Sequence, residues 1–231
     1  MTKIAYLQFD PQTRSQPQNI AFLIKKLGRI KNTLIILPEL FLSSYYDFTP
    51  ISSAELSDTL FPLLQLSRKN DLSLVGSLPI QEKKYLYNRS VYISEGKITG
   101  YKDKFNLYAH EKKQFRPGKN KTKIFKYKNI HFLSEICLDV MDPIIIRKLA
   151  TKIQLLCVSS TVSVTYLRDI TRTRSLENQI ISIFANRSGF EKNGVQYLGQ
   201  SAIFLPDGKT VPHQTKKGTH FRSWDLEKIP S

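Results

Sequence analysis

Cysteine and histidine are scarce in this 231-residue chain, and neither residue type has the spacing of a metal site. The two cysteines, Cys137 and Cys157, lack the close pairing of zinc-binding or dithiol motifs, and the four histidines are dispersed. This pattern argues against a structural zinc site and against a dense disulfide framework. We therefore expect a protein that uses neither a metal nor another cofactor.

Long hydrophobic runs are also missing. No apolar stretch approaches the ~20 residues that a membrane-spanning helix needs. The first ten residues, M-T-K-I-A-Y-L-Q-F-D, have the pattern of a strand and not of a signal peptide. The sequence therefore predicts a cytoplasmic protein without a membrane partner.

Acidic residues are few relative to basic ones. Nineteen Asp and Glu stand against 35 Lys and Arg, which gives a formal net charge of +16. Such an excess favours anionic partners or substrates. However, the basic residues are scattered, and no nucleic-acid-binding motif accompanies the densest group, at residues 119–128. We favour a solvated, lysine-rich surface, with a module that binds nucleic acid or an anionic surface as the alternative.

The residues that are present predict an α/β fold. Residues 3–9 have the pattern of a strand, residues 20–30 that of an amphipathic helix, and residues 33–37 that of a strand buried on both faces. This order predicts a βαβ unit in a largely buried sheet. Since no linker or repeat interrupts the chain, we expect a single domain covering residues 1–231.

Further elements follow along the chain. Helices are expected at residues 53–69, 144–150 and 166–177, and strands at 72–78, 85–93, 97–101, 155–159, 179–186, 201–205 and 221–226. The polar segment 102–118 mixes lysines, aromatic residues and a glutamate without a regular period. Such loops on rigid scaffolds commonly carry functional sites, although a mobile charged loop has the same composition.

Cys137 ends the apolar run 130–136, which has the pattern of a buried strand. Asp142-Pro143 then breaks the pattern, so this cysteine is predicted at a strand-to-helix corner. A thiol there can face a cleft, and the N–H groups of the next turn can stabilise negative charge beside it. The alternative is a buried cysteine that acts as a small hydrophobic residue, which is the interpretation we favour for Cys157.

Glu39 follows Pro38 just beyond the predicted strand 33–37. Open α/β sheets collect functional groups at the carboxyl ends of their strands. Leucines on both sides of Glu39 argue against simple exposure on a loop, because an unpaired buried carboxylate is costly. The sequence therefore predicts a partner or a chemical task for Glu39.

These residues belong to a series of short motifs along the chain. They are L-Q-F-D at 7–10, I-I-L-P-E-L-F-L-S-S-Y at 35–45, G-K-I-T-G-Y-K-D-K-F-N-L at 96–107, E-K-K-Q-F-R-P-G at 111–118, I-C-L-D at 136–139, R-S-L-E-N at 174–178, A-N-R-S-G at 185–189 and G-Q-S-A-I-F-L-P-D-G at 199–208. With them the chain resembles the nitrilase superfamily of carbon-nitrogen hydrolases. The resemblance implies a four-layer α-β-β-α sandwich, in which helices flank two central mixed β-sheets, and a homodimer.

The resemblance also implies roles for individual residues. Glu39 matches the general base, Cys137 the nucleophile and Lys104 the lysine that stabilises the transition state, because Lys104 stands in the K-x-x-L pattern. Glu111 matches a supporting glutamate, and the backbone N–H of Leu138 is expected to help stabilise the oxyanion. Two positions depart from the family pattern: Ile144 replaces a glutamate and Ser44 replaces a glycine.

The expected reaction is hydrolysis of a small linear carboxamide through a thioester on Cys137. N-carbamoyl compounds or nitriles are alternative substrates, and transfer of the acyl group to an amine is an alternative outcome. Tyr45, Phe105, Tyr108 and Thr161 are expected to form the substrate pocket. The net positive charge favours an anionic amide.

Overall fold

Two β-sheets form the centre of the molecule. The computed structural model describes residues 2–119, 122–211 and 218–226. The first sheet has the order β15-β1-β2-β4-β5-β6, with β3 paired to β4, and the second has the order β14-β13-β10-β9-β8-β7. A separate two-stranded ribbon joins β11 and β12. Both large sheets are mixed, since parallel pairs lie at their centres and antiparallel pairs toward their edges.

The bounds of the elements are as follows. The first sheet contains β1 (Lys3–Gln8), β2 (Thr33–Ile36), β3 (Ile51–Ser52), β4 (Leu72–Glu82), β5 (Tyr85–Ser94), β6 (Lys97–Asp103) and β15 (His220–Asp225). The second contains β7 (Ile124–Tyr127), β8 (Ile130–Ile136), β9 (Leu155–Ser160), β10 (Ile181–Asn186), β13 (Ala202–Phe204) and β14 (Thr210–Val211). The ribbon consists of β11 (Ser188–Phe190) and β12 (Gln196–Leu198). The helices are α1 (Gln16–Leu27), α2 (Leu56–Asn70), α3 (Pro143–Leu149) and α4 (Tyr166–Asn178), and short 3₁₀ turns are η1 (Glu111–Lys113), η2 (Cys137–Met141) and η3 (Ala150–Lys152).

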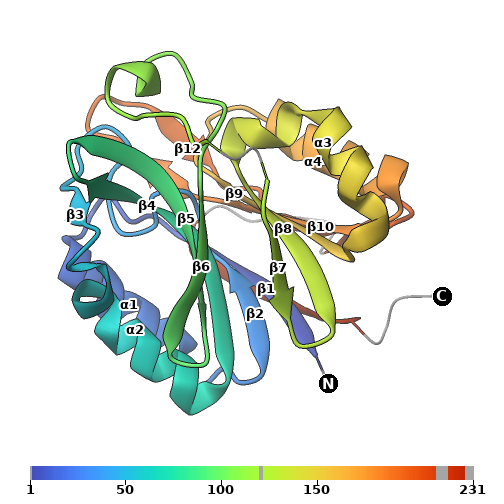
Figure 1. Cartoon of the computed structure of the whole chain (residues 1–231), viewed down its shortest axis with the longest axis horizontal. Helices are drawn as coiled ribbons and strands as arrows, with labels where there is room; N and C mark the ends of the chain where they lie inside the picture. Colours follow the sequence, from blue (N-terminus) through green and yellow to red (C-terminus); the bar gives the residue numbers. More distant parts are fainter. Residues whose placement is uncertain (1, 120–121, 212–217, 227–231) are drawn as a thin grey trace.

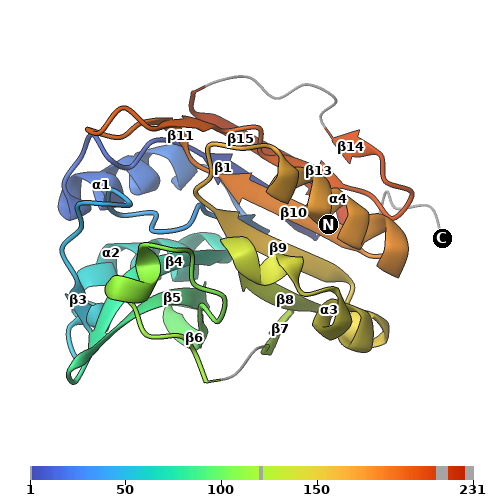
Figure 2. The same ribbon diagram turned by 90° about the horizontal axis from the view of Figure 1, so that it is seen from above.

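The helices cover the outer faces of the two sheets. α1 and α2 lie on one side of the molecule and α3 and α4 on the opposite side, with both sheets between them (Figure 1). Figure 2 shows the same layers from above. The architecture is therefore the four-layer α-β-β-α sandwich that the resemblance implied.

Alternation along the strands explains the layers, because successive strand residues face opposite sides of a sheet. On β8, Phe132 packs in the core between the sheets, while Leu133 packs against α3 and α4. On β9, Cys157 faces the core between the sheets and Leu156 faces the helices. Cys157 is fully buried, as expected for a core residue.

α1 is stabilised by a capping box at its start and by one buried apolar face. Ser15 caps the helix with its side chain and forms a reciprocal capping box with Gln18. Ile20, Leu23 and Leu27 then bury one face of α1 against the first sheet. This helix joins β1 to β2, which pair in parallel, and the predicted βαβ unit is confirmed.

Most predicted elements are present with shifted ends. The helix expected from residue 53 begins at Leu56. The strand expected from residue 179 begins at Ile181, because Gln179 ends α4 in a left-handed conformation with a φ of 53°. The strand expected at 221–226 is β15, which pairs with β1. Segment 102–118 is not wholly irregular, since Lys102 and Asp103 belong to β6 and η1 lies inside it. Within the described residues, no helix is both long and apolar enough to span a membrane.

Candidate active site

Glu39 lies just beyond β2 and is completely buried. Its backbone N–H donates to the carbonyl oxygen of Ser160 on β9 at 3.3 Å, which ties this corner to the facing sheet. The next residue, Leu40, has a φ of 51° and donates its N–H to Ser77 Oγ at 3.0 Å. The strained turn at Leu40 therefore holds Glu39 between the two sheets.

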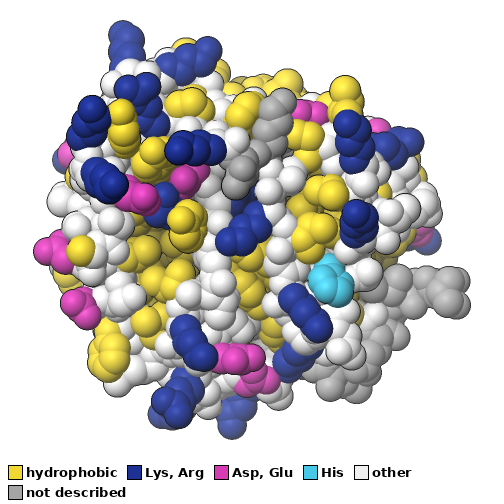
Figure 3. Space-filling model, viewed as in Figure 1, with side chains coloured by type: hydrophobic (Ala, Val, Ile, Leu, Met, Phe, Trp, Pro, Cys, Tyr) yellow, Lys and Arg dark blue, Asp and Glu magenta, His cyan; other side chains and the backbone are white. Residues whose placement is uncertain are grey.

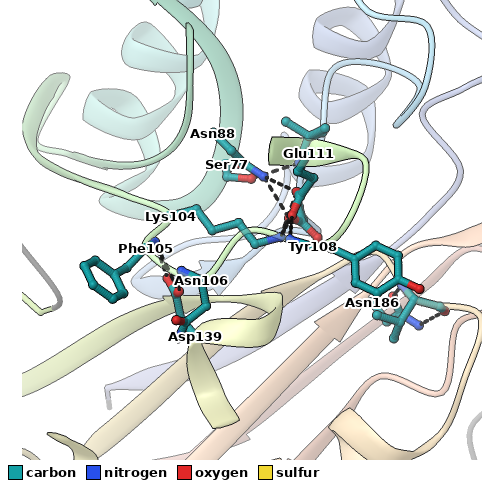
Figure 4. Close-up of polar contacts among 12 residues, drawn as sticks. Ser77, Asn88, Lys104, Phe105, Asn106, Tyr108, Glu111, Asp139 and Asn186 are labelled. Atoms are coloured by element: carbon teal, nitrogen blue, oxygen red, sulfur yellow. Dashed lines mark hydrogen bonds and ion pairs between the residues drawn. The ribbon is translucent and has the colours of Figure 1, made fainter. Parts of the chain in front are cut away.

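Lys104 binds two carboxylates in the interior. Its Nζ donates to Glu39 Oε1 at 2.7 Å and to both carboxylate oxygens of Glu111 at 2.8 Å. The side chains of all three residues are at most 1% exposed. Figure 4 shows Lys104 reaching from the end of β6 toward Glu111. The structure thus brings together three of the residues that the sequence predicted for the site.

Asn88 on β5 also takes part, and the sequence interpretation missed it. Its Nδ2 donates to Glu39 Oε1 at 2.8 Å and lies 3.4 Å from Glu111 Oε1. The residue is fully buried. An asparagine inside a strand with a buried face was the available signal, since buried polar side chains need hydrogen-bond partners.

One oxygen of Glu39 remains available for chemistry. Oε1 accepts hydrogen bonds from Lys104 and Asn88, whereas the buried Oε2 has no hydrogen-bond partner among the described residues. Burial raises the pKa of Glu39 to about 7, with Lys104 opposing and Glu111 reinforcing the increase. This carboxylate can therefore exchange a proton near neutral pH.

Cys137 lies at the corner between β8 and η2. Its φ of 50° is in the left-handed region, which a cysteine adopts only at a cost. Asp142 caps α3 immediately afterwards by accepting hydrogen bonds from the N–H groups of Ile144 and Ile145. The D-P pair thus ends the 3₁₀ turn and starts α3, close to the helix that the sequence predicted at residues 144–150.

The charges of Glu39, Lys104 and Glu111 affect the pKa of the Cys137 thiol. Burial raises the pKa of Cys137 above its ordinary value, the charge of Glu39 raises it further, and Lys104 opposes both. The sulfur therefore rests as a thiol and not as a thiolate. Such a nucleophile needs a base to remove its proton as it attacks.

Cys137 opens onto a cavity of about 230 Å³. Tyr45, Tyr108 and Thr161, three of the four residues expected to form the substrate pocket, line it, as does Leu138. Phe105 instead lines a separate cavity of about 980 Å³, whose lining does not include Glu39, Lys104 or Cys137. The expectation that Phe105 forms part of the Cys137 cavity is therefore wrong.

A second buried ionic cluster supports the I-C-L-D segment. Lys102 donates to Glu135 and, at 2.7 Å, to Asp139 Oδ2. Asp139 Oδ1 also accepts the backbone N–H groups of Phe105 and Asn106, as Figure 4 shows. This cluster links the segment after β6, which carries Lys104, to the turn that carries Cys137.

Arg187 organises the opposite side of the cavity. This fully buried residue donates to Glu191 at 2.9 Å and to Asp10 at 3.2 Å, and its guanidinium lies 4.5 Å from the ring centroid of Tyr197. Ser44 donates to the same Glu191 at 2.6 Å. The serine that departs from the family pattern therefore anchors the loop that carries Tyr45.

Within the described residues, no group of three or more His, Cys, Asp or Glu side chains is arranged to hold a metal ion. The charged groups that act on Cys137 are the carboxylates of Glu39 and Glu111 and the ammonium of Lys104. These groups suit proton transfer and charge stabilisation at a carbonyl carbon.

Comparison with known proteins decides the family. The carbon-nitrogen hydrolase family profile matches residues 3–230. The chain belongs to the carbon-nitrogen hydrolase family. It is an enzyme of the nitrilase superfamily, as the motifs indicated.

Curated relatives of this hydrolase agree with the assignment. A nitrilase of Pyrococcus abyssi is 27% identical over 91% of this chain and 84% of its own length. An omega-amidase of Escherichia coli (strain K12) is 25% identical over 90% of this chain and 83% of its own length. The chain therefore spans most of the length of these relatives.

Solved structures share the fold of the hydrolase. A variant of an amidase of Nesterenkonia superposes with a TM-score of 0.84 and 21% identity, covering 98% of this chain and 91% of that one. A superfamily protein of Xanthomonas campestris gives a TM-score of 0.82 at 18% identity, again covering 98% and 91%. The sandwich of two sheets and its helical layers are common to all three.

Proposed function

We propose that this carbon-nitrogen hydrolase cleaves small linear carboxamides through a thioester on Cys137. The observation that carries the proposal is the buried network of Glu39, Lys104, Glu111 and Asn88, whose charges act on Cys137 at the cavity surface. A lysine and two carboxylates buried without solvent are costly, and a catalytic task accounts for them. The amidases and the nitrilase among the relatives support the same class of reaction.

The first step forms the thioester. The free Oε2 of Glu39 takes the proton of the Cys137 thiol while the sulfur attacks the amide carbon. The carbonyl oxygen becomes an oxyanion, which the ammonium of Lys104 and the backbone N–H of Leu138 stabilise. Glu39 then returns its proton to the nitrogen, and ammonia or an amine leaves as the carbon–nitrogen bond breaks.

The second step releases the acid. Glu39, now ionised again, removes a proton from a water molecule that attacks the thioester carbon. The same ammonium and N–H group stabilise the second oxyanion. The carbon–sulfur bond breaks, the proton returns from Glu39 to the sulfur, and a carboxylic acid leaves. A single carboxylate therefore serves both halves of the reaction.

Glu111 and Asn88 position the reacting groups in this scheme. Glu111 contacts Lys104 through both oxygens and accepts the backbone N–H of Tyr108 at 2.6 Å, which fixes the ammonium relative to the loop. Asn88 holds Glu39 Oε1 and so leaves Oε2 for proton transfer. Both roles place atoms without forming bonds to substrate.

Glu39, Lys104 and Cys137 could also act on other substrates that carry a carbon open to attack by a thiol. N-carbamoyl compounds and nitriles are the alternatives in hydrolysis, and an amine acceptor in place of water gives acyl transfer. A panel of amides, ureido acids and nitriles, assayed for ammonia release with and without an amine acceptor, distinguishes these outcomes. We expect faster ammonia release from small open-chain carboxamides than from ureido acids or nitriles.

The decisive variant is Cys137→Ala. We expect it to abolish turnover while the far-ultraviolet circular dichroism and melting temperature stay close to wild type, because only one small side chain at a cavity surface changes. Cys157→Ala is the matched control, since it removes the other thiol from the core and leaves the chemistry intact. Undiminished amide hydrolysis by Cys137→Ala contradicts the proposal.

We also propose a homodimer. Met141, Ile144 and Leu176 are 46%, 63% and 50% exposed on the outer layer formed by η2, α3 and α4. Apolar side chains on one layer are a surface that a second copy can cover. Light scattering tests this, and a monomeric mass at micromolar concentration contradicts it.

A further inference from the structure

The cavity at Cys137 has an aromatic wall. Six ring-bearing side chains line it: Tyr45, Tyr46, Tyr108, His110, Tyr166 and Tyr197. His110 stacks on Tyr46 with ring centroids 4.9 Å apart and meets Tyr45 edge-on at 5.0 Å. The other lining residues are aliphatic or carry a small hydroxyl, apart from Cys137 itself. None of the described lining residues is Asp, Glu, Lys or Arg.

The nearby cations are already paired. Lys104 contacts Glu39 and Glu111, so this buried group holds two carboxylates and one ammonium. Arg187 lies behind the ring of Tyr197 and is paired with Asp10 and Glu191. The positive charge of each cation is already balanced by two carboxylates, so neither offers an unpaired charge to a second, ionised carboxylate at the far end of a ligand.

His110 does not provide a positive charge either. Burial lowers the pKa of His110, although the charge of Glu111 opposes this, so the imidazole is neutral at neutral pH. Its Nε2 is buried and has no hydrogen-bond partner among the described residues. A neutral imidazole can exchange a hydrogen bond with a polar group on a ligand but cannot pair with a carboxylate as an ion.

The size of the cavity limits the ligand. A cavity of about 230 Å³ suits a small amide better than a large ligand. One wall is fixed by Asn186, whose side chain accepts from the N–H of Val162 at 2.9 Å and donates to its carbonyl oxygen at 3.0 Å. The segment that carries Val164 is therefore held by hydrogen bonds at this end.

We propose that the site accepts carboxamides whose acyl group is uncharged and apolar, and that it discriminates against amides bearing a second, ionised carboxylate. The proposal rests on the amidase function proposed above and narrows its substrate class. An ionised carboxylate placed among tyrosine rings without a cation loses its hydration and gains no ion pair, which is unfavourable. The net charge of +16 belongs to the surface and does not extend to this pocket.

A pair of amides of equal size tests the proposal. Isocaproamide and succinamate have the same number of non-hydrogen atoms, but an isopropyl end in the first is a carboxylate in the second. We expect kcat/KM for isocaproamide to exceed that for succinamate by on the order of 100-fold. An equal or higher value for succinamate overturns the inference and leaves the amidase function standing.

Binding to Cys137→Ala separates the pocket from the chemistry. In this variant neither amide is consumed, so ligand-detected NMR titration reports affinity alone. We expect isocaproamide to bind at least about tenfold more tightly than succinamate, a difference of about 1.4 kcal/mol. Equal binding of the two amides, or no binding of either, overturns the inference whatever the result of the turnover assay. If Cys137→Ala binds isocaproamide more tightly than succinamate but the wild-type protein hydrolyses neither, only the proposed function is contradicted.

A charge placed in the pocket gives the converse test. Val164 lines the cavity and is 44% exposed, so a longer side chain fits at the rim. We expect Val164→Arg to raise the ratio of succinamate to isocaproamide turnover at least about tenfold, because it supplies the missing counter-ion. Val164→Gln is the matched control of polar, uncharged character and should leave the ratio near that of wild type. An unchanged ratio in Val164→Arg contradicts the proposal.

Discussion

The ammonium of Lys104 lies 2.7 Å from Oε1 of Glu39, on the carboxylate oxygen that Asn88 also contacts. The second oxygen, Oε2, is left without a hydrogen-bond partner among the described residues. The two residues follow different strands, β2 and β6, and are 65 positions apart in the sequence. Their pairing leaves one oxygen of a buried base free for a proton, which makes the pH dependence of the reaction predictable.

We expect kcat/KM to rise as the pH increases through about 7. Burial is the main cause of the raised pKa of Glu39, so its basic form becomes populated only as the pH approaches and passes about 7. Glu39→Gln should lower the rate by about 10²- to 10⁴-fold and remove this rise. Initial rates of ammonia release between pH 5.5 and pH 8.5 are the measurement.

Glu135→Gln is the control for that pH profile. Burial also raises the pKa of Glu135 to about 7, yet this residue pairs with Lys102 and does not line the Cys137 cavity. We expect the variant to keep a rise centred near the same pH. If the rise disappears in Glu135→Gln and persists in Glu39→Gln, the group that titrates is Glu135, and the role proposed for Glu39 is contradicted.

Alkylation should distinguish the two cysteines. Cys137 lines the cavity and is 5% exposed, whereas Cys157 is fully buried between the sheets on β9. We expect iodoacetamide to modify Cys137 well before Cys157, as measured by peptide mass spectrometry. In urea both thiols should react at similar rates. Faster labelling of Cys157 in the folded protein shows that the Cys137 cavity is closed to the reagent.

The sequence was sufficient for the parts of the site that follow strands. Glu39 and Cys137 were predicted at strand ends because an apolar run stopped at a breaker, and both are found there. Lys104 was selected by the K-x-x-L pattern, which the nearby Lys102 does not have. The structure shows both lysines buried with acidic partners, so burial alone does not separate them. The catalytic roles of Glu39, Lys104 and Cys137 remain predictions.

Side-chain direction was the part that the sequence did not reveal. Phe105 was expected in the pocket together with Tyr108, but neighbours in an extended segment such as Lys104 and Phe105 point to opposite sides. Lys104 points into the buried cluster and Phe105 lines the other cavity. Asn88 contacts Glu39 across 49 positions and Ser44 contacts Glu191 across 147, and the sequence does not show which distant partner a buried polar side chain meets.

The Lys102 cluster should matter for stability. Lys102→Met leaves Glu135 and Asp139 buried without their cation, and we expect a loss of about 3–5 kcal/mol in the free energy of unfolding. Lys97→Met, on the exposed part of the same strand, should change it by less than about 0.5 kcal/mol. Urea unfolding measures both. Equal effects contradict a structural role for the cluster.

The decrease in the free energy of unfolding caused by Lys102→Met should also depend on pH. Burial raises the pKa of Glu135 and Lys102 lowers it, so removing the lysine raises it further above the value in the unfolded chain. A folded-state pKa that is raised means that folding takes up a proton, and the favourable contribution is lost as the pH rises through that pKa. We therefore expect the variant to be more strongly destabilised at pH 8 than at pH 5.5.

The surface charge should be separable from catalysis by salt. Figure 3 shows basic side chains spread over the face in view, and Lys84, Lys112, Lys113 and Arg116 line the large cavity. Counterion release makes binding to nucleic acid fall steeply with salt, whereas an uncharged amide has no such dependence. From about 50 mM to about 500 mM NaCl, we expect hydrolysis of isocaproamide to change less than about twofold and any binding of single-stranded RNA to be lost.

Charge removal at the large cavity completes the test of the alternative function. Lys84→Gln and Arg116→Gln change residues outside the Cys137 cavity, so we expect amide hydrolysis to stay at the wild-type rate. If the chain were primarily a nucleic-acid-binding module, each variant should instead weaken binding and reduce the slope of log K against log salt by about 1. RNA binding that persists at about 500 mM NaCl, together with an inactive Cys137 cavity, contradicts the hydrolase proposal and favours the binding module.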